Sequence, residues 1–207
     1  QPHGTLLFWG LLTEGGIQVN VKGDRFSNEV RGYSEQAVEV IAQPDKVAWE
    51  IWDEGGHKLG LDFQDYRNGI EMGAHKSADT VEGIAERSGI PLDALQKTFA
   101  NVAAYHSGTK EDPTGRDWSS SKPLQPPYHF AKITGALFHT QGGLVVNDKT
   151  QVLREDGSAL PNVFAGGGAA RGLSGPSRWG YLSGNGLLTA TVLGRIAGRE
   201  AAKMVKS

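Results

Sequence analysis

Two glycine-rich segments in the C-terminal part of the chain have the composition and spacing of a binding site for a negatively charged group. The apolar run at residues 162–165 leads into three glycines at 166–168, and two more glycines flank Asn185 at the start of an apolar pattern over 186–202. This order predicts a strand, a loop and a helix, whose first backbone N–H groups and dipole form a site for a negatively charged group. A glycine-rich connection without a ligand has the same spacing, so spacing alone leaves both interpretations open.

Two common phosphate-binding patterns are absent from this stretch. No Lys-Ser or Lys-Thr pair follows the glycines, as the Walker pattern requires, and the alanines and Arg171 after Gly168 break the G-x-G-x-x-G dinucleotide pattern. We therefore expect the loop to touch a cofactor without holding its pyrophosphate.

The elements that must position this stretch show mixed helix and strand patterns. Helix patterns cover residues 33–42, 80–89, 91–108 and 186–202, and strand patterns cover 15–26, 47–54, 128–139, 143–147, 150–155 and 162–165. The segment 109–127 has no periodicity, and such long loops are uncommon unless they are functional or join domains. On the closing helix, the side chains expected on the buried side are Leu187, Leu188, Thr191, Val192 and Ile196.

Composition excludes several classes of protein. Of the 207 residues, 38% are hydrophobic and 21% charged, as in ordinary soluble proteins, and the net charge of -2 gives no reason to expect nucleic acid or a membrane as partner. The absence of cysteine excludes disulfides, thiolate catalysis and sulfur-ligated metals, and is compatible with a cytoplasmic location. No metal site is predicted. The 29 glycines, roughly twice the usual share, cluster at turns between apolar runs.

Three segments in the C-terminal half resemble the signature of a flavoprotein superfamily. They read FHTQGGLVVN at residues 138–147, LPNVFAGGGAARGLSG at 160–175 and LSGNGLLTATVLGRIAGREAA at 182–202. The superfamily is that of the FAD-dependent fumarate reductase and succinate dehydrogenase flavoprotein subunits, and the segments also resemble 3-ketosteroid dehydrogenases. GGIQVNVKGDRFSNE at 15–29 is similar to the entry into the substrate-capping domain of this superfamily. The resemblance therefore covers nearly the whole chain in the expected order.

The resemblance implies an α+β fold in two parts. Residues 1–130 correspond to a mixed α/β substrate-capping domain with its adjoining segment, and residues 131–207 to the C-terminal β-strands and helix of a Rossmann-like FAD-binding domain. The N-terminal Rossmann half, with the pyrophosphate fingerprint, is expected to be missing. The chain would then be a fragment whose partners are that half of the same polypeptide and a small-molecule substrate. We expect the fragment alone to be inactive and to bind FAD weakly or not at all.

The resemblance also implies roles for individual residues. His139 corresponds to a histidine that binds a carboxylate or carbonyl oxygen of the substrate beside the flavin, where an imidazole can stabilise developing charge. Arg178 resembles the arginine that clamps the substrate carboxylate. A structural histidine and a solvated surface arginine are the alternatives. Many relatives carry, where Gly168 stands, a glutamate that reaches the cofactor ribose, which puts one cofactor contact in doubt. The residues expected to contact FAD are Gly142, Gly143, Gly167, Gly168, Gly184, Asn185, Gly186, Leu187 and Leu188.

The sequence departs from the superfamily at the residues that fumarate reductases use for proton transfer. Trp9 and Leu12 occupy the places of a Glu-x-x-Arg pair that fumarate reductases use as a proton relay. Tyr33 falls where those enzymes place an arginine acid, with Arg31 two residues earlier, and ketosteroid dehydrogenases carry a tyrosine there as proton acceptor. A packing residue at the start of a helix is an equal alternative for Tyr33.

The resemblance implies an oxidoreductase whose substrate is not merely a small dicarboxylate. The segment between Arg178 and Asn185 is longer than in fumarate reductases, and it brings Trp179 and Tyr181 to that edge of the implied pocket unless they only anchor a domain seam. We predict hydride transfer between FAD and a carbon–carbon bond next to a carbonyl or carboxylate, with Tyr33 or Arg31 handling the proton. A small-ligand binding module and a catalytically inactive flavoprotein relative are the alternatives.

Overall fold

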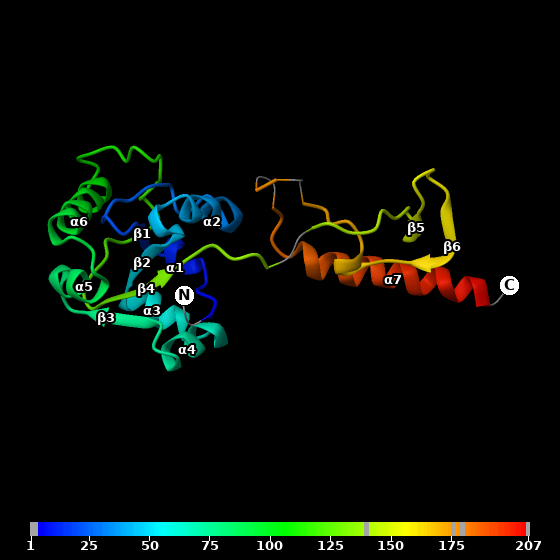
Figure 1. Cartoon of the computed structure of the whole chain (residues 1–207), viewed down its shortest axis with the longest axis horizontal. Coiled ribbons are helices and arrows are strands. Elements are labelled where there is room, and N and C mark those ends of the chain that lie inside the picture. The colour runs from blue at the N-terminus through cyan, green and yellow to red at the C-terminus, as the bar shows by residue number, and fades with distance from the viewer. Residues whose placement is uncertain (1–3, 139–140, 175–176, 179–180, 206–207) are drawn as a thin grey trace. The chain divides into compact units, whose positions relative to one another are not determined.

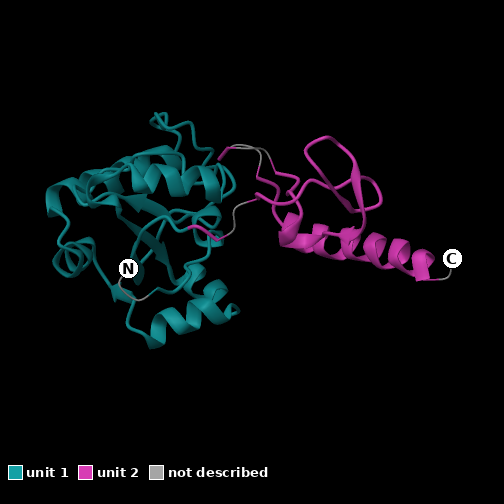
Figure 2. Ribbon diagram, turned by 45° about the vertical axis from the view of Figure 1, so that its right-hand side comes forward, with its two compact units in different colours: residues 1–136 teal, residues 137–207 magenta. Residues whose placement is uncertain are grey.

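The chain divides into two compact units. The structure, a computed structural model, describes residues 4–138, 141–174, 177–178 and 181–205. The units comprise residues 1–136 and 137–207 (Figure 2). Within the described residues, no helix combines the length and apolar character needed to cross a membrane.

The first unit is built on a four-stranded antiparallel sheet (Figure 1). Its strand order is β1 (Ile17–Val19), β2 (Ala48–Asp53), β4 (Tyr128–Ile133) and β3 (His75–Ala78). Ile17 lies opposite Ile51, and Ile51 lies opposite Phe130. Because side chains alternate between the two faces of a strand, this register places the three apolar side chains on one face. They belong to the larger apolar core, with Ile84 and Leu95 from two helices, α5 (Val81–Ser88) and α6 (Leu92–His106).

The opposite face of the sheet carries polar side chains beside a smaller apolar cluster that includes Trp52 and Ala131. Gln18, Glu50, Ala131 and His75 lie opposite one another across the four strands. Gln18 and Glu50 are buried there, and Gln36 of α2 donates to Gln18. Figure 1 shows α2 on the other side of the sheet from α5 and α6. The remaining helices of the unit are α1 (Gly10–Thr13), α2 (Tyr33–Ile41), η1 (Pro44–Lys46), α3 (Glu54–Gly60) and α4 (Gln64–Glu71).

Local signals explain where the predicted helices begin and end. Thr80 Oγ1 accepts from the backbone N–H of Gly83 at 3.1 Å and caps α5, and Gly89 ends it with a φ of 79°. Pro91 precedes α6, where its missing N–H costs nothing. The helices expected at 33–42, 80–89 and 91–108 are thus confirmed as α2, α5 and α6.

Three helices and one strand of this unit do not follow from the apolar pattern. α3 contains Gly55 and Gly56, which read as a turn, but Asp53 Oδ1 accepts from their backbone N–H groups at 2.9 and 3.2 Å and so caps a helix. β3 is polar except for Ala78, and it joins the sheet by pairing with β4. α1 and α4 likewise depend on contacts that a short sequence window does not contain.

The second unit is smaller and has a short hairpin and a long helix. Its elements are β5 (Gln151–Leu153), β6 (Ala159–Phe164), η2 (Gly167–Ala169) and α7 (Asn185–Val205). Val152, Ala165 and Ala170 form its core, with Leu193 of α7 packed against them. The strand expected at 143–147 is wrong as a continuous element, because this segment makes only isolated bridges, at Leu144 with Ala170 and at Val146 with Val152.

The expected buried side of α7 is also wrong. Leu187, Leu188 and Val192 are exposed, Leu187 by 80%. The helix instead packs on η2 through the face that includes Ala190 and Leu193. Glycines at 166 and 167 allow this close approach, because a Cβ on Gly166 would lie 3.1 Å from Cβ of Leu193 and one on Gly167 would lie 3.2 Å from Cβ of Ala190. Within the described residues of this unit, the leucine face is left uncovered.

Candidate functional site

Tyr33 and Arg31 lie at the start of α2 in the first unit. Tyr33 is the first residue of the helix and is 46% exposed. Its ring packs edge-on against Trp9, with the centroids 5.1 Å apart. Arg31 is exposed in the turn before the helix, where its backbone N–H donates to the carbonyl of Asn28. Tyr33 and Arg31 thus lie two residues apart in the segment that follows the buried Glu29.

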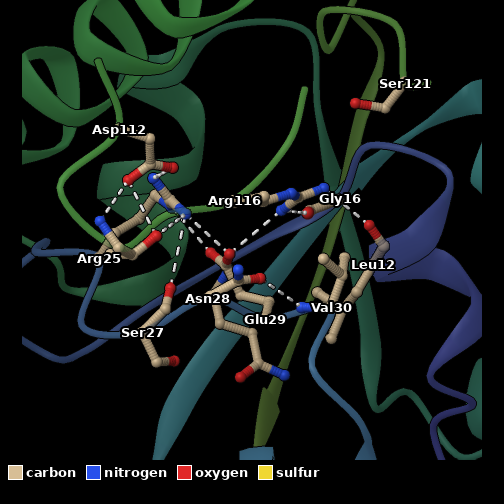
Figure 3. A network of polar contacts seen from close by, with 12 residues as sticks. Leu12, Gly16, Arg25, Ser27, Asn28, Glu29, Val30, Asp112, Arg116 and Ser121 are labelled. Atoms are coloured by element: carbon tan, nitrogen blue, oxygen red, sulfur yellow. Dashed lines mark hydrogen bonds and ion pairs between the residues drawn. The ribbon is translucent and has the colours of Figure 1, made fainter. Parts of the chain in front are cut away.

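A buried ionic network lies behind this turn (Figure 3). Glu29 is completely buried, and Arg25 donates to both of its carboxylate oxygens at 2.8 Å. Arg116 Nη1 donates to Glu29 Oε2 at 3.1 Å, and Arg25 Nη1 donates to Asp112 Oδ2 at 2.9 Å. Two of the four groups come from the loop at 109–127, which thereby gains a structural role. The sequence signal that could have indicated the network is the charged pair in RFSNE, with Arg and Glu four residues apart.

Burial and charge pairing oppose each other in this network. Burial favours loss of the Arg25 proton, but the hydrogen bonds and charges of Glu29 and Asp112 outweigh it and raise the pKa of Arg25. For Arg116 burial prevails and lowers the pKa, although Glu29 opposes it. Burial would raise the pKa of Asp112, but hydrogen bonds from Thr114 and the charge of Arg25 bring it below its usual value. Each charge thus depends on its partners to remain buried.

Glu50 is a second buried carboxyl group on the polar face of the sheet. Its Oε2 accepts from Gln18 Nε2 at 2.7 Å, and Gln18 Oε1 accepts from Gln36 Nε2 at 2.6 Å. Burial raises the pKa of Glu50 to about 8, and the hydrogen bond from Gln18 only partly opposes this. Glu50 is therefore mostly protonated and neutral at pH 7. Sequence reasoning missed this residue, because no local pattern marks a buried acid in an apolar strand.

The candidate glycines of the second unit divide into two kinds. A Cβ on Gly143 would lie 2.4 Å from the carbonyl carbon of Ala170, and one on Gly167 would lie 3.2 Å from Cβ of Ala190. These two glycines allow close packing within the unit, and Gly167 also has a φ of 56°. A Cβ on Gly168 would meet nothing within 4 Å, so this glycine faces open space.

The start of α7 is open to a ligand. Among the described residues, nothing lies within 4 Å of a Cβ position on Gly184 or Gly186, and Leu187 and Leu188 are exposed. Asn185 is buried, and its Nδ2 donates to Ser174 Oγ and to the carbonyl of Leu182 at 2.8 Å. The side chain of Asn185 thus holds the preceding loop, while the first backbone N–H groups of the helix have no partner within it. A helix terminus of this kind favours a negatively charged or electron-rich group.

The remaining candidates lie in the same unit or outside the described residues. Arg178 is half-buried, and Gly142 is exposed beside Gly143. His139 and Trp179 lie outside the described residues. In the part of the chain that is described, no three His, Cys, Asp or Glu side chains are grouped so that they could hold a metal ion.

Comparison with known proteins identifies the family of this chain. The family model described as the FAD binding domain matches residues 1–187. The chain belongs to this family. It is 32% identical to a probable fumarate reductase of Shewanella frigidimarina over 91% of this chain and 31% of the relative.

Solved structures of flavoproteins agree with this assignment. The open conformation of a flavocytochrome c3 fumarate reductase has a TM-score of 0.70 and 29% identity over 96% of this chain and 34% of that chain. A 3-ketosteroid-Δ4-(5α)-dehydrogenase from Rhodococcus jostii RHA1 has a TM-score of 0.60 and 27% identity over 94% and 40%. These matches confirm three predictions for this chain. It belongs to the fumarate reductase and succinate dehydrogenase flavoprotein superfamily, it has an α+β fold, and its cofactor is FAD. The chain spans about a third of the length of these relatives.

Proposed function

We propose that this FAD binding domain chain is the substrate-capping and C-terminal part of a flavin-dependent oxidoreductase. The reaction is hydride transfer between FAD and a carbon–carbon bond next to a carbonyl or carboxylate. The observation that carries this proposal is the open, glycine-flanked start of α7 in a chain whose family is that of FAD binding domains. Residues 1–130 form the cap and residues 131–207 complete an FAD-binding domain whose N-terminal half is supplied by the rest of the polypeptide.

The start of α7 would hold the flavin. The backbone at Gly184, Gly186 and Leu187 offers N–H groups and the positive end of a 21-residue helix, while Asn185 holds the loop before it. FAD supplies the group that accepts or donates the hydride. Negative charge on a reduced flavin is stabilised at such a helix terminus by about 0.3–1 kcal/mol or more.

The substrate would be bound and oriented by His139 and Arg178. A guanidinium pairs with a carboxylate through two parallel hydrogen bonds, and an imidazole N–H can donate to an oxygen that gains charge as the double bond is polarised. Tyr33 gives or takes the proton at its phenolic oxygen, with Arg31 as the alternative proton donor. The relative named as a fumarate reductase supports a carboxylate next to the reacting bond, and the one named as a ketosteroid dehydrogenase supports a carbonyl.

The test is a visible absorption spectrum of the complete gene product as purified. A flavin spectrum, followed by its bleaching or recovery with enones, unsaturated acids and their saturated forms, is the expected result. A colourless protein that also rejects added FAD would refute the proposal. A flavoprotein that exchanges no electrons with any of these compounds would leave an inactive relative as the better description.

A further inference from the structure

Trp9 contacts both ends of the segment that leads into α2. Its indole N–H donates to the backbone carbonyl of Glu29 at 2.9 Å. Its ring meets the ring of Tyr33 edge-on, with centroids 5.1 Å apart and planes at 70°. Aromatic pairs prefer this T-shaped arrangement. One tryptophan side chain therefore restrains the backbone before the helix and the ring of the first helical residue.

Arg116 links the segment that follows Trp9 to Glu29. Its Nη2 donates to the carbonyl of Leu12 and its Nη1 to that of Gly16, both at 2.8 Å, so it binds the end of the short helix α1 that starts directly after Trp9. The same guanidinium pairs with Glu29 at 3.1 Å (Figure 3). Because both side chains are buried, charge-assisted bonds of this kind fix geometry more firmly than exposed ones do.

Gly32 sets the direction in which the chain enters the helix. Its φ of 147° lies in a region that L residues rarely adopt, and a Cβ there would lie 2.5 Å from Glu35 Oε2. The segment from Glu29 to Tyr33 is therefore fixed by its hydrogen bonds at one end and by a glycine turn at the other. Trp9 adds the contact that reaches the Tyr33 ring itself.

We propose that Trp9 is a positioning residue for Tyr33, and that the buried Arg116–Glu29 pair holds Trp9 in place. The inference rests on the function proposed above, in which Tyr33 moves the proton. Tyr33 is 46% exposed, and exposed side chains exchange between rotamers on picosecond to nanosecond timescales. Packing against Trp9 reduces that freedom and keeps the phenolic oxygen where the proton is transferred.

The first test measures the position of Tyr33 without any substrate. The chain is labelled with 3-fluorotyrosine, and the ¹⁹F resonance of Tyr33 is assigned by its loss in Tyr33→Phe. In Trp9→Phe this resonance is expected to move toward the shift of free 3-fluorotyrosine. The matched control is Trp52→Phe, which also loses an indole N–H bond, that to Tyr66 at 2.8 Å, and should leave the Tyr33 resonance in place. A Tyr33 resonance that is the same in Trp9→Phe and in the unmodified chain would overturn the inference.

The second test is a double-mutant cycle on turnover of the complete flavoprotein. Tyr33→Phe should lower kcat by about 100-fold, in the range of general acid–base catalysis. Trp9→Phe should lower kcat by about tenfold with little change in KM, and the double variant should be no slower than Tyr33→Phe alone. The fold-reductions in kcat caused by Trp52→Phe and by Tyr33→Phe should multiply in the double variant.

The outcomes separate the two proposals. If Tyr33→Phe is impaired but the effects of Trp9→Phe and Tyr33→Phe multiply, Trp9 acts only on the structure and the inference fails while the proposed function stands. If Tyr33→Phe turns over normally in a flavin-containing enzyme, the proton role of Tyr33 fails and the catalytic part of the inference fails with it.

Discussion

At the scale of single residues, Glu50 shows how burial sets protonation. Its carboxyl group lies inside the first unit, where Oε2 accepts from the amide of Gln18 and Oε1 has no hydrogen-bond partner among the described residues. The pKa is about 8 in the folded chain and about 4.5 in the unfolded chain. Between these values the folded state binds more protons, so the stability of the chain falls as pH rises from about 4.5 to 8.

Glu50→Gln should therefore stabilise the chain at alkaline pH. The amide resembles the protonated acid, accepts the same hydrogen bond from Gln18 and carries no charge that must be buried. We expect a gain of about 4 kcal/mol in the free energy of unfolding at pH 8 and of less than about 1 kcal/mol at pH 5. Urea unfolding at both pH values measures this. Glu71→Gln, at an exposed site, is the control, and an equal effect of Glu50→Gln at both pH values would contradict the prediction.

His139 and Arg178 should separate substrate chemistry from cofactor binding. In the complete flavoprotein, His139→Ala and Arg178→Ala should each lower kcat/KM by at least about 100-fold, because the proposed function assigns each of them a polar contact to the substrate. Flavin content should remain normal, since the cofactor is held by other groups. Steady-state kinetics with absorbance at the flavin maximum measure both quantities. Arg195→Ala, on the exposed surface of α7, serves as the control, and near-normal turnover in both site variants would refute their assignment.

At the scale of elements, a histidine cluster joins α3, α4, β3 and β4. The rings of His57 and His129 stack 4.2 Å apart, His57 Nδ1 shares a hydrogen bond with Tyr66 at 2.9 Å, and His129 Nε2 lies 3.1 Å from Glu54 Oε2. Burial, with the nearby His57 and His129, lowers the pKa of His75 to about 4. Burial also lowers the pKa of His57. The imidazoles of His57 and His75, which lie between these elements, are therefore neutral at pH 7.

Acid should loosen this cluster. His75 binds a proton near pH 6.5 in the unfolded chain but only near pH 4 in the folded chain, so its contribution is complete above about pH 6.5 and is lost as pH falls toward 4. We expect a loss of about 2 kcal/mol from this residue between pH 7.5 and 4.5. His75→Gln should reduce the difference in unfolding free energy between these two pH values, as measured in urea. An unchanged difference would show that His75 does not cause the acid sensitivity.

Two glycine substitutions test how the second unit is packed. Gly143→Ala would place a methyl group 2.4 Å from the carbonyl carbon of Ala170 and should destabilise this unit by about 2 kcal/mol or more. Gly198→Ala in α7 meets nothing within 4 Å and should stabilise the helix by about 0.5–1 kcal/mol. Thermal unfolding followed by circular dichroism measures both. Opposite signs are expected, and a neutral Gly143→Ala would contradict the close approach at Ala170.

At the scale of the whole molecule, the exposed leucines of α7 and the length of the relatives both agree with the proposal that another part of the polypeptide completes the FAD-binding domain. The chain covers about a third of these flavoproteins, and the leucine face of α7 is uncovered within its own unit. We expect the 207-residue chain alone to bind FAD weakly or not at all, because the function proposed above places the pyrophosphate site in another part of the polypeptide. Titration of FAD fluorescence with the chain should show no saturable change. A stoichiometric complex would contradict this expectation.

The sequence by itself determined the elements with strong local signals and the family. The start of α5 after Thr80 and its end at Gly89 follow from the sequence, because a capping side chain and a left-handed glycine act within a few residues. The motifs around Gly166 and Asn185 identified the superfamily, since their order along the chain is preserved. The roles of His139, Arg178 and Tyr33 are still predictions that follow from this resemblance.

Only the tertiary structure decided which residues are buried together. The pairing of Arg116 with Glu29 joins residues 87 positions apart, and the row from Gln18 to His75 depends on the register of four strands. The same holds for α7, whose apolar pattern predicted a buried leucine face that its own unit leaves exposed. A side chain is buried only where another element packs against it, and that neighbour comes from a distant part of the sequence.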